Sequence, residues 1–110
     1  MTKEQLRNYR KIKEEHRQIE QRLQALESRA ENEDILGPLQ ELYREKLKKL
    51  ADAQLAIELA IDTLDYAERK LIRLRYFDGL PWHRVATGIH YSEQHTLLLH
   101  GKILQKLKGE

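Results

Sequence analysis

Apolar residues recur every three or four positions at the start of the chain, and nearly every position between them is charged or Gln. The recurring positions are Leu6, Tyr9, Ile12, His16, Ile19, Leu23, Leu26 and Ala30. Their heptad-like spacing is typical of a helix that packs along one seam. We therefore expect a helix from about Lys3 to Arg29, started by a capping box between Thr2 and Gln5.

A second stripe follows a break at residues 31–38, which contain Asn32, Gly37 and Pro38. Because proline is excluded from helix interiors, the second helix is expected to begin near Pro38. Its seam reads Tyr43, Leu47, Leu50, Gln54, Ile57, Ile61 and Leu64, widened by Leu39, Leu42, Ala53, Leu55 and Ala60. The two stripes predict a long antiparallel, coiled-coil-like hairpin over residues 1–64. Its second seam is broader than one partner needs, so we expect a further layer from the C-terminal segment or a second chain.

Residues 65–110 predict three shorter helices. Asp65 and Glu68 form a capping box for a helix over residues 66–77, with Leu71, Ile72 and Tyr76 inside and Asp78-Gly79 at its end. Pro81 opens a helix over residues 82–89, whose apolar face is Trp82, Val85, Ala86 and Ile89. Ser92 caps a last helix that runs to about Lys108, with an inner face of Thr96, Leu99, Ile103, Leu104 and Leu107.

The last two predicted helices have the spacing of a helix-turn-helix motif. Ala86 is the small residue needed where the helices meet, and His90, four positions on, can adopt the positive φ that the turn requires. Thr96, six positions further, supplies the medium side chain that fills the gap between the helices. The sequence therefore predicts an all-α chain in which a three-helix module at residues 65–110 follows the hairpin. Compact three-helix domains that bind no nucleic acid also show this spacing.

Residues 64–107 resemble region 4 of bacterial sigma factors. The matching residues are Leu64, Glu68, Arg69, Ile72, Leu74, Arg75, Tyr76, Gly79, Val85, Ala86, Ser92, Leu104 and Leu107. With Trp82, Tyr91-Ser92, Leu99-His100-Gly101 and Ile103-Leu104, the segment is also similar to small phage and prophage proteins in the style of the RinA and ArpU late transcription regulators. The resemblance implies promoter or regulatory DNA binding in phage gene control, often beside host RNA polymerase. It also implies that Arg75 can brace the module instead of meeting phosphate.

The first turns of the last helix would enter the major groove in such a module. The candidate base-reading residues are Glu93, Gln94, His95, Leu97 and Leu98. Gln94 suits adenine, Glu93 suits cytosine, and the leucines suit a thymine methyl group. The candidate phosphate contacts are Arg73, Arg75, His83, Arg84, Ser92, Lys102 and Lys106.

The candidate reading helix departs from the sigma pattern, which commonly has Arg around positions 93, 95 and 97. Here the helix carries Glu93 and the run Leu97-Leu98-Leu99, of which the inner face needs only Leu99. Three alternatives follow for Leu97 and Leu98: packing against the hairpin, contact with DNA, or contact with a partner protein.

Charge and composition leave this interpretation open but exclude several others. Residues 1–64 carry a net charge of −1 and residues 65–110 a net charge of +3, which permits nucleic-acid binding without requiring it. There is no cysteine, no metal-binding histidine pair, no glycine-rich phosphate loop and no catalytic constellation. We therefore expect no enzyme activity, no cofactor, no metal and no small-molecule substrate. We also expect no membrane-spanning helix and no secretory signal, and a location in the cytoplasm of a bacterial host.

The sequence thus favours a phage or prophage transcription regulator that binds double-stranded DNA. Because one module neutralises few phosphates, we expect a homodimer to supply affinity. The alternative is an interaction or assembly protein, such as a small DNA-packaging subunit or an adaptor, that uses the same helices.

Overall fold

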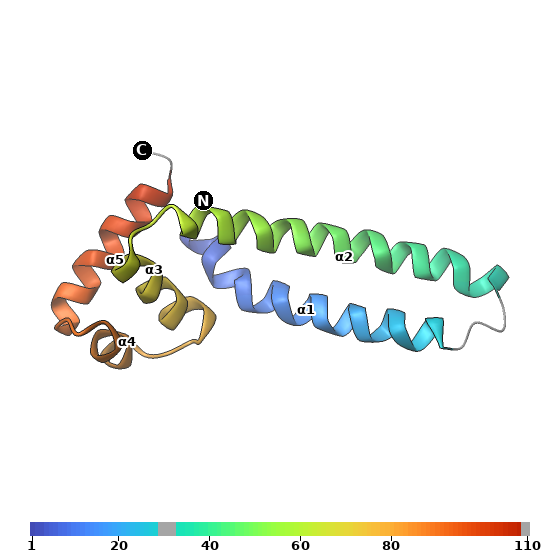
Figure 1. Ribbon diagram of the computed structural model, residues 1–110, viewed down its shortest axis with the longest axis horizontal. Helices are drawn as coiled ribbons and strands as arrows, with labels where there is room; N and C mark the ends of the chain where they lie inside the picture. Colours follow the sequence, from blue (N-terminus) through green and yellow to red (C-terminus); the bar gives the residue numbers. More distant parts are fainter. Residues whose placement is uncertain (29–32, 109–110) are drawn as a thin grey trace. The chain divides into compact units, whose positions relative to one another are not determined.

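The computed structural model of the chain describes residues 1–28 and 33–108, and these residues are helical with no strand (Figure 1). The helices are α1 (Lys3–Glu27), α2 (Glu33–Asp62), α3 (Tyr66–Ile72), the π-helical turn η1 (Arg73–Phe77), α4 (Trp82–Ile89) and α5 (Glu93–Leu107). The all-α prediction is confirmed. None of the helices described combines the length and the apolar character needed to cross a membrane.

The chain forms two compact units, and the division differs from the predicted boundary after residue 64. One unit combines Met1–Arg10 with Ala56–Glu110, and the other is Lys11–Leu55. Both ends of the hairpin therefore belong with the C-terminal helices. The Tyr9 ring, for example, stacks on Phe77 at 3.8 Å between centroids, and its hydroxyl donates to Glu58 at 2.7 Å. Burial and that acceptor raise the pKa of Tyr9 to about 12.

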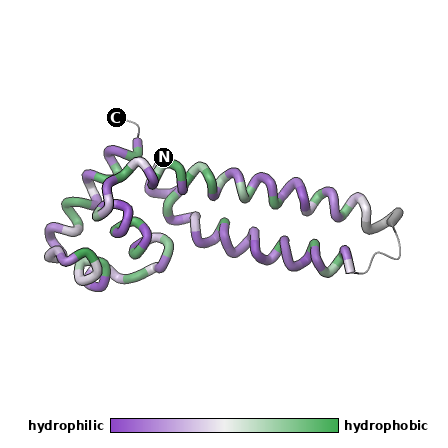
Figure 2. Tube along the Cα trace, viewed as in Figure 1, coloured by the Kyte–Doolittle hydropathy of each residue, from purple (hydrophilic) through white to green (hydrophobic). Residues whose placement is uncertain are grey.

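The Lys11–Leu55 unit has the antiparallel pairing that the two stripes predict. Leu23 is buried between the helices, and the other seam positions of this unit are half-buried: Ile12, His16, Ile19, Leu26, Tyr43, Leu47, Leu50 and Gln54. Figure 2 shows the alternation of apolar and polar residues along both helices. Leu42 and Leu55, expected to widen the seam, are instead 45% and 56% exposed. Within the described part of this unit, nothing covers the Leu42 and Leu55 side chains, so the further layer expected over this part of the seam is not seen there.

The expected start of the second helix was wrong, because α2 begins at Glu33 and contains Pro38. Pro38 is the sixth residue of α2, so the hydrogen bond it cannot donate belongs to the second turn. The remaining turns continue uninterrupted to Asp62. The part of the predicted break that includes Asn32, like the seam position Ala30, lies outside the described residues.

The unit that contains the chain ends holds most of the core. Its buried apolar residues are Leu6, Tyr9, Ile57, Ile61, Leu64, Leu71, Ile72, Tyr76, Val85, Ala86, Ile89, Ile103 and Leu107. Helices α3, α4 and α5 pack against one another in pairs. Of the positions predicted to face inward, Trp82, Leu99 and Leu104 are only half-buried.

The turn between α4 and α5 has the predicted conformation. His90 is left-handed, with φ 63° and ψ 36°, and the Tyr91 N–H closes the turn on the Ala86 carbonyl at 3.0 Å. Ser92 caps α5 by accepting from the His95 N–H at 3.1 Å. Thr96 is fully buried, and its hydroxyl donates to the Ser92 carbonyl at 2.7 Å. A short helix, a left-handed residue and a capped second helix are therefore all present.

Replacing His90 by Val should destabilise the chain by about 1 to 2 kcal/mol, because a β-branched residue is strained at positive φ. His90→Gly should leave the free energy of unfolding near the wild-type value or raise it, since glycine adopts this conformation freely. Urea unfolding of the two variants measures the difference. Equal stabilities would contradict a left-handed residue 90.

Candidate nucleic-acid interface

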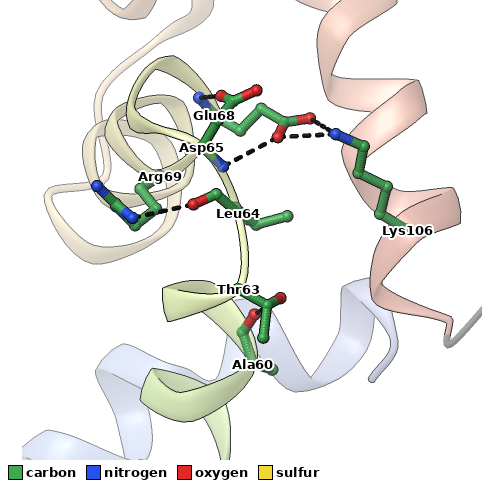
Figure 3. A network of polar contacts seen from close by, with 7 residues as sticks. All are labelled: Ala60, Thr63, Leu64, Asp65, Glu68, Arg69 and Lys106. Carbon is green, nitrogen blue, oxygen red and sulfur yellow. Dashed lines mark hydrogen bonds and ion pairs between the residues drawn. The ribbon is translucent and has the colours of Figure 1, made fainter.

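A network of polar contacts joins the junction between α2 and α3 to α5 (Figure 3). The Asp65 carboxylate accepts from the Glu68 N–H at 3.1 Å, and the Glu68 carboxylate accepts from the Asp65 N–H at 3.2 Å. The predicted capping box is therefore confirmed. The Glu68 side chain is only 3% exposed, and the Lys106 ammonium donates to both of its oxygens at 2.9 and 2.7 Å. This contact raises the pKa of Lys106 and ties α5 to α3.

The predicted base-reading residues all lie on the exposed side of the first two turns of α5. Glu93, Gln94 and His95 are exposed, and Leu97 and Leu98 are 48% and 63% exposed. These residues share a unit with both ends of the hairpin. Both leucines are largely exposed in this unit, and packing against the hairpin, contact with DNA and contact with a partner protein stay the three alternatives.

His95 differs from the other base-reading candidates because its ring already packs against another side chain of the protein. It stacks on the Tyr91 ring with 4.5 Å between centroids and 16° between planes. Tyr91 itself is half-buried in the turn. The Tyr91–His95 pair therefore stiffens the entry to α5, and the residues that project without such a contact are Glu93, Gln94, Leu97 and Leu98.

Three of the seven predicted phosphate contacts are used inside the fold. Arg73 pairs with Glu58 at 3.4 Å and lies 5.6 Å from the Phe77 ring centre. Arg75 donates to the Leu80 carbonyl at 3.0 Å and covers the Trp82 ring at 4.4 Å. Of the two alternatives for Arg75, the structure shows the bracing contact.

Lys106 is the third, since it neutralises the buried carboxylate of Glu68. Removing these side chains to contact DNA would leave a carboxylate or carbonyl without its donor. Arg73, Arg75 and Lys106 are therefore structural residues first, and of the three only the bracing role of Arg75 had been expected. Their partners Glu58, Leu80 and Glu68 lie 15, 5 and 38 residues away.

The other four phosphate candidates are exposed. His83 and Arg84 lie in the first turn of α4, Ser92 is the N-cap of α5, and Lys102 lies further along α5. Arg84 and Lys102 form no ion pair with any described residue. Lys102 follows Gln94 and Leu98 at intervals of four, so the three share one face of the helix. This face and the first turn of α4 form the candidate interface.

Sequence reasoning missed a buried polar cluster beneath this interface. His100 is 7% exposed, its Nε2 lies 2.5 Å from the Tyr76 hydroxyl, and its ring meets Trp82 edge-on at 4.7 Å. Burial, followed by the nearby cations of Lys3, Arg75 and Arg7, lowers its pKa to about 4. The signal was available, because His100 lies four residues after Thr96 and three before Ile103 on the inner face.

His100 should make stability depend on pH. The unfolded chain binds a proton near pH 6.5 and the folded chain only near pH 4, so protonation favours unfolding. The contribution of the neutral imidazole is complete above pH 6.5 and is lost as the pH falls toward 4. Relative to His100→Gln, which does not titrate, the wild type should lose about 2 to 3 kcal/mol across this window. Urea unfolding at stepped pH measures this, and parallel curves for the two proteins would contradict it.

The second missed feature is a basic pocket of about 330 Å³ in the same unit. Three cations from α1, Lys3, Arg7 and Arg10, line it together with Arg75, Tyr76 and Trp82. Their spacing of four and three residues places the α1 cations on one face of the helix, but the sequence alone did not show what that face meets.

A family model described as Protein of unknown function (DUF722) matches residues 1–108. The chain belongs to this family. The match spans the hairpin and the C-terminal helices alike, so the two parts are features of one family architecture. Neither the curated proteins nor the solved structures contain a significant match to this chain.

Proposed function

We propose that this protein is a phage or prophage transcription regulator that binds promoter-region DNA through a helix-turn-helix formed by α4 and α5. Helix α5 follows a turn with the left-handed residue His90 and begins after the N-cap Ser92. The observation that carries the proposal is the exposed face of the first two turns of this helix. In a helix-turn-helix, that face enters the major groove. The resemblance of residues 64–107 to sigma region 4 supports the same assignment.

In this proposal, the face of α5 supplies the base contacts. Gln94 pairs with adenine, Glu93 accepts from the cytosine amino group, and Leu97 and Leu98 pack on thymine methyl groups. Arg84, His83 and Lys102 contact the flanking phosphates, which position the helix without reading sequence. Ser92 and the start of α5 approach a phosphate at the helix N-terminus.

The protein acts as a homodimer in this proposal. One module offers few exposed cations, and two modules double the number of phosphates neutralised. Exposed Leu42 and Leu55 of the Lys11–Leu55 unit supply apolar surface for the second copy. Host RNA polymerase is the partner that the sigma-like resemblance suggests. No chemical step is assigned to the protein.

The test is selection of bound fragments from a library of phage and host genomic DNA, with the wild-type chain at two salt concentrations. We expect the selection to recover a sequence motif, and we expect the affinity for it to fall steeply with salt. In a plot of the logarithm of the binding constant against the logarithm of the salt concentration, each neutralised phosphate contributes about −0.9 to the slope. Half-sites about 10 base pairs apart would show the dimer. Failure to enrich any fragment with a folded protein would reject the proposal.

A second candidate function is an assembly or adaptor role, and the exposure of Leu97 and Leu98 favours it. Adjacent exposed leucines suit a protein partner as well as a thymine methyl group. The mass of the particle in light scattering separates the two: a small DNA-packaging subunit forms a ring, whereas a regulator forms a dimer.

A further inference from the structure

The basic pocket brings together residues that are distant in the sequence. Lys3, Arg7 and Arg10 come from the first turns of α1, Arg75 and Tyr76 from η1, and Trp82 from the start of α4. All six belong to the same compact unit. Its volume of about 330 Å³ exceeds what a single water or chloride ion needs.

The charge of this pocket is unbalanced. Four of the seven lining residues, which also include Gly79, are cations, and no carboxylate lines the pocket. Within the described chain, Lys3, Arg7 and Arg10 form no ion pair. Cations near the N-terminus of α1 also oppose the helix dipole, so the arrangement costs stability. A cluster of like charges that the fold does not neutralise is suited to an anionic ligand.

The neighbouring histidine responds to this field. Burial is the main reason that the pKa of His100 lies near 4, and the next contributions come from Lys3, Arg75 and Arg7. Three of the four pocket cations therefore act on a group beneath the pocket wall. If each of these cations were paired with a carboxylate, its effect on the pKa of His100 would be smaller.

The contacts of Arg75 and the glycine at position 79 hold the pocket in shape. The Nη1 atom of Arg75 donates to the Leu80 carbonyl at 3.0 Å while the guanidinium covers Trp82, which leaves other guanidinium donors for a ligand. Gly79 has φ +71°, and a Cβ atom there would collide with the Arg10 guanidinium. Glycine at this position therefore both permits the turn and makes room for Arg10.

We propose that this pocket binds phosphate groups through Lys3, Arg7, Arg10 and Arg75, and that in the DNA complex it holds the phosphodiester backbone. The second part rests on the proposed function. Arginine forks match the geometry of phosphate oxygens, and several cations suit a multiply charged anion better than a single carboxylate. Trp82 lies directly before His83 and Arg84, so the pocket continues the candidate surface at the start of α4.

The pocket replaces cations that the helix-turn-helix lacks. Arg73 and Lys106 are paired with carboxylates inside the fold, which reduces the number of cations available at the predicted surface. Lys3, Arg7 and Arg10 restore three positive charges from a segment outside residues 64–107. The N-terminal helix is then part of the DNA-binding surface and not only a dimerisation element.

The first experiment needs no DNA. It follows the fluorescence of Trp82, which is the only tryptophan of the chain and lines the pocket. In the wild type, iodide should quench Trp82 more strongly than neutral acrylamide does, and pyrophosphate should protect against iodide beyond sodium chloride of equal ionic strength. The variant Lys3→Gln/Arg7→Gln/Arg10→Gln should lose both effects and keep its acrylamide quenching. If pyrophosphate does not protect Trp82 in the wild type, the proposal that the pocket binds phosphate groups is wrong.

The second experiment measures the salt dependence of duplex binding. The same triple variant should lower the log–log slope by about 0.9 for each phosphate that it no longer neutralises, while the order of preference among DNA sequences is unchanged. The matched control is Lys46→Gln/Lys48→Gln/Lys49→Gln, which removes three exposed charges outside the pocket. An unchanged slope in the pocket variant, or an equal fall in the control, would overturn the backbone contact.

The two experiments separate the failure of the pocket from the failure of the proposed function. Pyrophosphate protection without binding of any duplex would reject DNA binding and retain the pocket as a site for free phosphate compounds. Duplex binding with no change in the pocket variant would reject the pocket contact and leave the proposed function standing. A cooperative thermal unfolding of the triple variant, at or above the wild-type Tm, confirms that neither result reflects misfolding.

Discussion

Replacing Leu97 and Leu98 together by Ala is expected to weaken specific DNA binding on the order of 100-fold. The two side chains are 48% and 63% exposed, so they contribute surface and not core. Each truncation removes three carbons from a contact with thymine methyl groups, at about 0.8 kcal/mol per buried carbon in the fully buried limit. Alanine retains the helix propensity of leucine, so the free energy of unfolding should hardly change. Equilibrium titration of a selected duplex and of a scrambled duplex measures the effect.

A matched control exists for this double variant. Leu59 and Tyr66 are 60% and 72% exposed and lie outside the proposed DNA and dimer surfaces, and Leu59→Ala/Tyr66→Ala removes at least as much apolar side chain elsewhere. The Leu97/Leu98 variant should lose affinity for the selected duplex with an unchanged salt slope, because its charge is the same as that of the wild type. Wild-type affinity in this variant would assign the leucines to a protein partner and favour the assembly alternative.

Replacing Ile103 by Ala is expected to lower the free energy of unfolding by about 2 to 5 kcal/mol. Ile103 is fully buried on the inner face of α5, in the unit where α3, α4 and α5 pack together. The truncation removes transfer free energy and leaves a cavity that the helices can close only in part. For a domain of this size, each kcal/mol lowers the Tm by about 4 to 8 °C.

Ile103→Val gives the graded comparison, with an expected loss of about 0.5 to 1.5 kcal/mol. Calorimetry of both variants tests the prediction, and DNA binding measured well below the lowered Tm should be close to that of the wild type. An Ile103→Ala chain as stable as the wild type would contradict a core centred on α5. Loss of DNA binding in a fully folded Ile103→Ala chain would contradict the assignment of Ile103 to the core alone.

Local signals in the sequence were reliable where a few neighbouring residues decide the conformation. The capping boxes at Thr2 and Asp65 are present, and so are the left-handed His90 and the cap Ser92. Each cap depends on a side chain that contacts the backbone three residues further on, and the left-handed turn depends on the tolerance of His90 for positive φ. Pro38 is the exception, because the rule against proline in helices does not specify how many residues can precede it in the first turns.

The candidate site was predicted less completely than the fold. The exposure of Gln94, Leu97 and Leu98 follows from helical periodicity, and the structure agrees. The roles of Arg73 and Lys106 did not follow, because a cation has the same appearance in the sequence whether it faces solvent or an acceptor within the fold, whereas a bracing role for Arg75 was one of the alternatives that the resemblance implied. His100 was overlooked because its polar type concealed an inner-face position.

The sequence by itself determined the α-helices apart from the start of α2, their caps, the turn between α4 and α5 and the face of α5 that remains exposed. These features depend on residue type and on intervals of three or four, which the chain carries without any long-range contact. The tertiary structure decided which cations are already paired, the burial of His100 under Trp82, and the pocket that unites Lys3, Arg7 and Arg10 with Arg75. The pocket joins segments more than about 60 residues apart, and only the packing of α1 against the C-terminal helices within one unit brings them together.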